Sequence, residues 1–246
     1  MDLTPKVKFL GMTFDVTLMI GSVVSALIVM LLVFLLTRRL SVRPNGRQNV
    51  MEYIIDFISG ITGMMLEKKE SARYFSFALS TFLFILVANI LGVVVMVTAQ
   101  AHGPIPSLGI TAADLKMTDT VSWFKSPTSD INVTVAMAGA IFLYSHFAGI
   151  AKSPLGYLQH YVKPYWWMLP IHIIDEVSKP ATHALRLWAN IFAGEVLILI
   201  LREGMFYFTG VPLFAWMGFS LFVGCIQAYI FTVLAMVYIA QKVGEV

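Results

Sequence analysis

Long apolar runs separated by polar connections dominate the hydrophobic pattern of this chain. A helix rises about 1.5 Å per residue and must cross about 30 Å of hydrocarbon to span a membrane. Five runs are long enough, and we predict spans at about residues 16–36, 75–99, 131–151, 171–201 and 211–240. The last run would measure about 45 Å as a helix, so we expect it to be strongly tilted or to extend past the bilayer.

Residues 49–66 show a different pattern, in which polar and apolar side chains lie on opposite faces of a helix. The polar face carries Glu52, Asp56, Ser59 and Gly63. The opposite face carries Val50, Ile54, Phe57, Ile58, Ile61 and Met65. We therefore predict an amphipathic helix that lies along the membrane surface.

The composition agrees with lipid as the solvent. Of the 246 residues, 58% are hydrophobic and 13% are charged, which is about half the charged fraction of a soluble domain. The mean hydropathy is +0.80. We predict an all-α integral membrane protein in which residues 1–246 form a single membrane domain. The net charge of +3 and the lack of a basic face with interleaved aromatics argue against a nucleic-acid partner. A single cysteine excludes an internal disulfide and a thiolate metal site, and we expect no cofactor.

The positions of Lys and Arg predict the orientation of the chain. Ten of these residues lie near one set of span ends: Arg38, Arg39, Arg43, Arg47, Lys68, Lys69, Arg73, Lys152, Lys163 and Lys242. Five lie near the other: Lys6, Lys8, Lys116, Lys125 and Arg202. Because cytoplasmic connections carry the excess of positive charge, we expect the amino terminus outside and the carboxyl terminus in the cytoplasm.

The span at 171–201 carries a stripe of polar and charged side chains. Its members are His172, Glu176, Lys179, His183, Arg186 and Asn190, at intervals of four, three, four, three and four. This spacing places them within about 80° of arc on a helix. A charged side chain at mid-bilayer costs about 2.5–3.5 kcal/mol, so we expect the stripe to face protein or water and to handle ions.

Parts of the stripe also have a structural interpretation. Asp175, Glu176 and Lys179 lie near the predicted cytoplasmic end and could form local salt bridges at the interface. His172 and His183 could be hydrogen-bonded structural residues. Arg186 lies about halfway along the span, too deep to extend comfortably to the interface, and an ion-handling role is the better interpretation of it.

Glu195 lies nine residues beyond Arg186. On a helix this spacing corresponds to about 13.5 Å along the axis and about half a turn around it. The two side chains therefore cannot form a local ion pair. We expect them to face different surroundings at different depths.

Three segments resemble subunit a of the bacterial F-type ATP synthase. Residues 185–195 read LRLWANIFAGE, residues 224–234 read GCIQAYIFTVL, and residues 84–92 contain Asn89. The layout of the spans resembles this family over nearly the whole chain. Ala189 departs from the pattern, because the family commonly has glycine there, but the change removes no charge.

The resemblance implies a mechanism and a set of partners. Two aqueous half-channels would enter from opposite faces, and a ring of c subunits, each with a mid-membrane carboxylate, would turn past a long tilted hairpin formed by the last two spans. Further partners would be the b subunits of the peripheral stalk, the rest of the ATP synthase, the lipid bilayer and protons or Na⁺. The chain would be no enzyme on its own, and it would lie in a bacterial plasma membrane.

The resemblance also implies roles for particular residues. Arg186 would be the fixed positive charge that separates the half-channels, since a guanidinium stays protonated. Asn190 would line the same face, and Gln227 would complete the pairing from the last helix. Glu195 would be a relay in the outer half-channel. Asn89 and Glu176 are candidates for the inner one, and Ser220, Gly224 and Gln227 form a small and polar stripe that permits close packing.

Three other classes of membrane protein fit the sequence less well. A secondary ion-coupled transporter with a mid-membrane Arg/Glu site is the main alternative, and it predicts inverted repeats and broken helices in matching halves, which the sequence lacks. An intramembrane metal hydrolase would need convergent ligands, but His172 and His183 lie about 16.5 Å apart along a helix. A purely structural scaffold leaves Arg186 unexplained.

Overall fold

The computed structural model describes most of the chain. The described residues are 3–9, 11–38, 41, 46–95, 97–101, 103–105, 109–111, 115, 120–154, 157, 166–204 and 206–244. Four cations used in the orientation argument, Arg39, Arg43, Lys116 and Lys163, lie outside the described residues.

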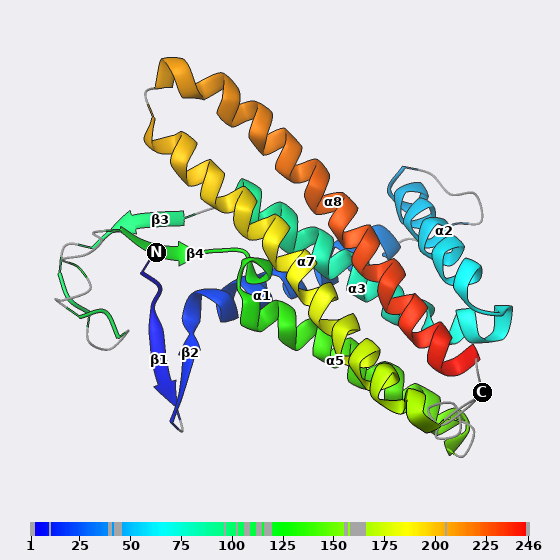
Figure 1. Ribbon diagram of the computed structural model, residues 1–246. Helices are drawn as coiled ribbons and strands as arrows, with labels where there is room; N and C mark the ends of the chain where they lie inside the picture. The colour runs from blue at the N-terminus through cyan, green and yellow to red at the C-terminus, as the bar shows by residue number, and fades with distance from the viewer. Residues whose placement is uncertain are drawn as a thin grey trace.

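Six α-helices make up most of the described chain (Figure 1). They are α1 (Val16–Thr37), α2 (Arg47–Met65), α3 (Lys68–Val94), α5 (Ile131–Lys152), α7 (Leu169–Glu203) and α8 (Phe206–Gly244). Five of the described helices, all except α2, are long and apolar enough to cross a membrane. The prediction of an all-α membrane protein with five spans is confirmed.

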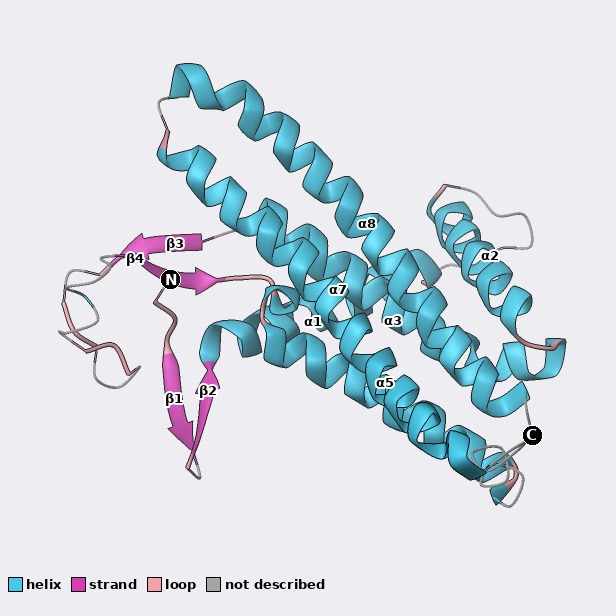
Figure 2. Ribbon diagram, in the orientation of Figure 1, coloured by secondary structure: helices cyan, strands magenta, loops and turns pink. Residues whose placement is uncertain are grey.

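Four short strands were not predicted (Figure 2). β1 (Lys6–Phe9) and β2 (Met12–Asp15) form an antiparallel hairpin that turns at Gly11, whose φ of 80° favours glycine. β3 (Val97–Gln100) pairs with β4 (Thr120–Phe124). The strands lie at one end of the helix bundle, which we call the strand end; the carboxyl terminus of α8 lies at the other, the tail end (Figure 1).

The predicted limits of the second span are wrong at both ends. We expected 75–99, but α3 begins at Lys68, because charged residues extend the helix beyond the uncharged run. It ends at Val94, and residues 97–99 belong to β3. Their apolar character comes partly from β-branched residues, which suit a strand, and pairing with β4 satisfies their backbone hydrogen bonds.

Two clusters of buried side chains hold the helices together. One lies toward the tail end, where Ile58 and Ile61 of α2 pack against α3 and against Met236 and Ile239 of α8. The other joins α3, α5, α7 and α8 through Ile85, Ile141, Leu187, Ile191, Ala228, Phe231 and Ala235. The apolar face predicted for residues 49–66 is therefore used in part to dock α2 on α3 and α8.

Helices α7 and α8 form a long antiparallel hairpin that extends past the other helices at its turn (Figure 1). They contain 35 and 39 residues, or about 52 and 58 Å of helix, well over the thickness of the hydrocarbon core. The hairpin predicted for the last two spans is present. It provides a continuous scaffold on which charged side chains are held at different depths.

Candidate functional site

Arg186 lies on α7 with its side chain exposed, on a face that points away from the core of the chain. Its neighbours Ala184 and Leu187 are completely buried and face the opposite way. The apolar side of α7 thus packs inward, as in any amphipathic helix. Arg186 is left on a surface where no part of the described chain covers it.

Asn190 and Gln227 link the two long helices one turn from Arg186. The Asn190 Nδ2 donates a hydrogen bond to the Gln227 Oε1 over 2.9 Å. Gln227 is buried, whereas Asn190 is exposed on the same side of α7 as Arg186. The pairing expected between these residues is present, and it fixes the register of α7 on α8 beside Arg186.

The small and polar stripe of α8 packs inside the chain. Ser220, Gly224 and Gln227 are all buried. A Cβ on Gly224 would lie 3.2 Å from the Cβ of Asn89 in α3, and Ser220 lies against Gly194 of α7. The close packing that we predicted for this stripe is therefore made with α3 and α7.

Asn89, our candidate for an inner half-channel, has buried hydrogen-bond partners that lie toward the strand end. Its Nδ2 donates to the Gly224 carbonyl oxygen over 3.0 Å, and its Oδ1 accepts a hydrogen bond from the Thr128 Oγ1 over 2.8 Å. Thr128 belongs to the short helix η2 (Pro127–Ser129), which lies toward the strand end. Asn89 is therefore a buried junction of α3, α8 and η2 in the strand half of the bundle, far along the helices from Glu176.

Glu195 is buried, with 4% of its side chain exposed. Its Oε2 lies 3.6 Å from the Nζ of Lys125, in the segment between β4 and η2. Ser126 and Ser129 lie beside the carboxyl group, but neither carboxyl oxygen makes a hydrogen bond of ordinary geometry within the described residues. Arg186 and Glu195 therefore meet different surroundings, as their half-turn offset predicts.

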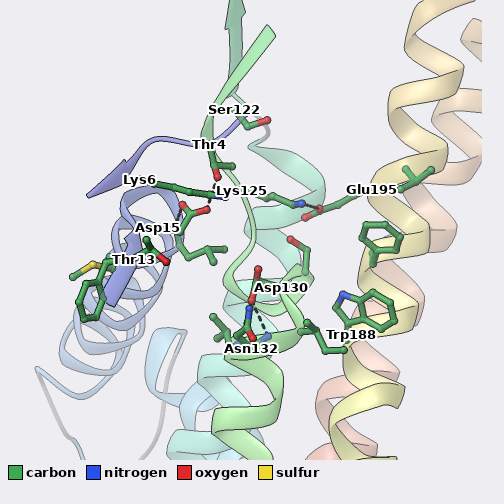
Figure 3. A pocket seen from close by; sticks show the side chains of 18 of the residues that line it. Thr4, Lys6, Thr13, Asp15, Ser122, Lys125, Asp130, Asn132, Trp188 and Glu195 are labelled. Carbon is green, nitrogen blue, oxygen red and sulfur yellow. Dashed lines mark hydrogen bonds and ion pairs between the residues drawn. The ribbon is translucent and has the colours of Figure 1, made fainter. Parts of the chain in front are cut away.

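Two cavities meet at Glu195. The larger, of about 850 Å³, opens among the β1–β2 hairpin, η2 and α7, and Lys125, Asp130 and Trp188 are among its lining residues (Figure 3). The smaller, of about 180 Å³, lies between α3, α7 and α8 and is lined by Asn190, Ser220 and Trp216 among others. Glu195 lines both, so its carboxyl stands between the strand-end opening and the side of α7 that carries Asn190.

A separate cluster of charges holds the tail end together. Glu176 of α7 pairs with Lys242 of α8 and with Lys179, and its Oε2 lies 3.4 Å from the Nε2 of His146 in α5. Lys179 also lies 2.9 Å from Asp175. The local salt bridges considered for this region are present. The cross-helix partners Lys242 and His146 were not predicted, because no local spacing connects them to Glu176.

His183 has a structural environment. The side chain is 1% exposed, and its ring centroid lies 3.8 Å from that of Phe231 and 5.6 Å from that of Tyr238. It packs between α7 and α8 and so divides the predicted polar stripe. Glu176 and Lys179 lie in the tail-end cluster, and Arg186 and Asn190 lie on the exposed face.

Comparison with known proteins agrees with the motifs. The family model of the ATP synthase A chain matches residues 19–240. The chain is 40% identical over 242 residues to ATP synthase subunit a of Macrococcus caseolyticus (strain JCSC5402), covering 95% of this chain and 92% of the relative. It is 35% identical over 202 residues to ATP synthase subunit a of Staphylococcus aureus (strain JH9), covering 78% and 76%. The extent of these matches shows that the chain belongs to the ATP synthase A chain family.

Proposed function

We propose that this chain forms the two offset half-channels of a rotary motor, and that Arg186 separates them. The observation that carries the proposal is the placement of two charges on one helix. Arg186 is exposed on the free face of α7, while Glu195 is buried where two cavities meet. Such an arrangement suits a route that enters from one end and is interrupted by a fixed charge.

Membership of the family carries the general role. The chain is a multi-pass membrane protein and a non-catalytic subunit of the Fo part of F-type ATP synthase. Its role is in the proton transport that drives ATP synthesis, and its partners are the other subunits of that complex.

Arg186 acts as the separator in this proposal. Moving one charge through about 150 mV is worth about 3.5 kcal/mol, so a barrier between the half-channels must exceed that value. A guanidinium remains charged at all relevant pH values and repels a passing cation. Its exposed position on α7 would let it meet a carboxylate on each subunit of a c ring turning past the hairpin.

The outer half-channel would run through the strand end. Water in the 850 Å³ cavity would bring protons to Glu195, and the 180 Å³ cavity would lead on toward Asn190 and Ser220. The Asn190–Gln227 hydrogen bond would hold this wall in place beside Arg186. We assign Glu176 to the wall of the inner half-channel, as a fixed charge held by its partners, because it lies on the same helix at the opposite end of the bundle.

The remaining surfaces suit the other partners. The face of α7 and α8 around Arg186 would receive the c ring. The exposed apolar side chains of α1, such as Met19, Val23, Leu27, Met30 and Phe34, would face lipid or the b subunits. We place the strand end outside a bacterial plasma membrane and the carboxyl terminus in the cytoplasm, since Lys and Arg predominate near the latter side.

Substitution of Arg186 tests the proposal directly. In the intact ATP synthase in liposomes, Arg186→Ala should abolish proton-driven ATP synthesis while the complex still assembles. Arg186→Lys should also fail, because a lysine in a low-dielectric site can lose its proton. Lys69→Met on α3 is the control. Normal proton-driven synthesis in the assembled Arg186→Ala complex would refute the proposed role.

A further inference from the structure

We propose that Lys125 is a positioning residue of the outer proton route. Its ammonium is a tethered counter-charge that holds the Glu195 carboxylate at the junction of the two cavities and sets the proton concentration at which that carboxylate is loaded. The inference rests on the proposed function, because it assigns a partner to the relay at Glu195.

Lys125 and Glu195 form an ion pair between a connecting segment and α7. The Lys125 Nζ lies 3.6 Å from the Glu195 Oε2, and the two side chains point toward one another across the cavity wall (Figure 3). Among the described residues, Lys125 is the one cation within ion-pair distance of Glu195. Lys125 itself is 24% exposed and lines the larger cavity, so its ammonium also meets the water there.

The backbone that carries Lys125 is held firmly against two helices, α1 and α3. Ser126, next in the chain, donates its hydroxyl to the Ala88 carbonyl oxygen of α3 over 3.1 Å, and Thr128 bonds to Asn89. On the other side, a Cβ on Gly21 of α1 would lie 2.7 Å from the Lys125 carbonyl oxygen. Ser126 and Thr128 are fully buried. Lys125 is thus presented to α7 from a fixed base.

The other charged groups of the larger cavity are engaged elsewhere or exposed. Asp15 caps α1 by accepting the Thr17 backbone N–H over 2.9 Å and also binds the Thr4 hydroxyl. Asp130 caps α5 through the Asn132 backbone N–H over 2.8 Å. Lys6 is exposed on β1. The side chains from α3 and α8 that line the smaller cavity, such as Trp216 and Ser220, carry no charge.

This arrangement gives Lys125 a definite part in proton transfer. A proton from water in the larger cavity binds the Glu195 carboxylate, which becomes a neutral acid and loses its attraction for the ammonium. The same proton then leaves toward the smaller cavity, and the restored carboxylate pairs with Lys125 again. The ammonium keeps its own protons throughout. A cation at this distance stabilises the ionised carboxylate, so Lys125 favours release of the proton from Glu195 toward the rotor.

The test measures ATP synthesis by the intact complex in liposomes, with a K⁺ diffusion potential and a varied pH on the side that the strand end faces. In Lys125→Met the maximal rate of ATP synthesis should fall. The half-maximal rate should be reached at an about tenfold lower proton concentration on the side of the strand end. Lys125→Arg should restore both values, because it restores the charge. Lys8→Met, on the exposed part of β1 outside the cavity, should match the unmodified complex.

A second comparison shows whether Lys125 acts through Glu195. In a Glu195→Gln background, Lys125→Met should change the residual rate by less than about twofold. The inference is overturned if assembled Lys125→Met complexes keep the normal rate and proton dependence, or if Lys125→Arg behaves like Lys125→Met. If Lys125→Met fails to assemble, the result for Lys125→Arg decides the question. A normal rate and proton dependence of ATP synthesis in Lys125→Arg would support the charge role, and altered values would overturn it.

The two proposals fail separately in this design. If Arg186→Ala retains proton-driven synthesis, the proposed function is wrong whatever Lys125 does. If Arg186→Ala abolishes synthesis while Lys125→Met has no effect, only the assignment of Lys125 is wrong.

Discussion

Two carboxylates on the same helix, Glu176 and Glu195, have opposite environments. Glu176, near the tail end of α7, has cationic or imidazole neighbours from three helices: Lys179, Lys242 and His146. Glu195, nearer the strand end, has one cation, Lys125, and its carboxyl oxygens make no hydrogen bond of ordinary geometry within the described chain. Two cavities reach Glu195.

The difference shows how the neighbours of a carboxylate set its freedom to change protonation state, even on one helix. A carboxylate with several charge-assisted partners is held in one state, and it contributes to packing by joining α5, α7 and α8. A carboxylate with one partner and access to water can change its state with less disturbance. A charge inside the membrane is costly for both carboxylates, so each needs either a compensating partner or a functional role.

The largest effect separating the two carboxylates is expected from Glu195→Gln. The amide keeps the size of the side chain but cannot accept and release a proton, so proton-driven synthesis should fall about tenfold or more without loss of assembly. The loss is measured as the rate of ATP synthesis by the complex in liposomes, with Asp56→Asn on the exposed face of α2 as a control. An unchanged rate would make Glu195 a structural residue and remove the contrast with Glu176.

The tail-end cluster should respond mainly in stability. Lys242 pairs with Glu176 and is 5% exposed, so Lys242→Met removes a buried charge-assisted hydrogen bond worth about 2 kcal/mol. We expect a lower temperature of dissociation of the purified complex in detergent, with proton-driven synthesis per assembled complex falling less than in Glu195→Gln. If the rate per complex fell as far as in Glu195→Gln, both carboxylates would belong to the proton route equally.

A smaller effect is expected from the base that holds Lys125. A Cβ on Gly92 of α3 would overlap the Ser126 side chain, and overpacking of this kind costs about 1–3 kcal/mol. Gly92→Ala should displace the segment that precedes η2 and lower synthesis a few-fold. Gly139→Ala on α5 is the matched control, because no described atom outside its own stretch of helix lies within 4 Å of its Cβ position. Equal rates of synthesis in Gly92→Ala and Gly139→Ala would mean that the segment before η2 tolerates displacement.

Local periodicity was sufficient for several features of this protein. The number of spans, the long final hairpin, the amphipathic second helix and the half-turn offset of Glu195 from Arg186 all follow from residue spacing on a helix. Such features depend on one element at a time. The pairing of Asn190 with Gln227 came from the family resemblance, which carries information about packing that spacing alone does not.

The tertiary structure decided the contacts between distant segments. Between the second and third spans, residues 120–124 form a strand that the sequence did not predict, and Ser126 and Thr128 are buried against α3. The contacts of Asn89 with Gly224 and Thr128 could not be foreseen, because its depth depends on where α3 begins and ends. Lys125 was counted only as a charge outside a span, and Lys242 only as a charge in the tail.

Sequence alone thus determined which helix carries the charges that we propose to handle ions, and how Arg186 and Glu195 are turned relative to one another. Only the packing of α1, α3, α7 and η2 decided that Lys125 is the partner of Glu195 and that two cavities meet there. The physical reason is that helical geometry is set by bonds between near neighbours, whereas an ion pair between distant segments depends on how whole elements pack.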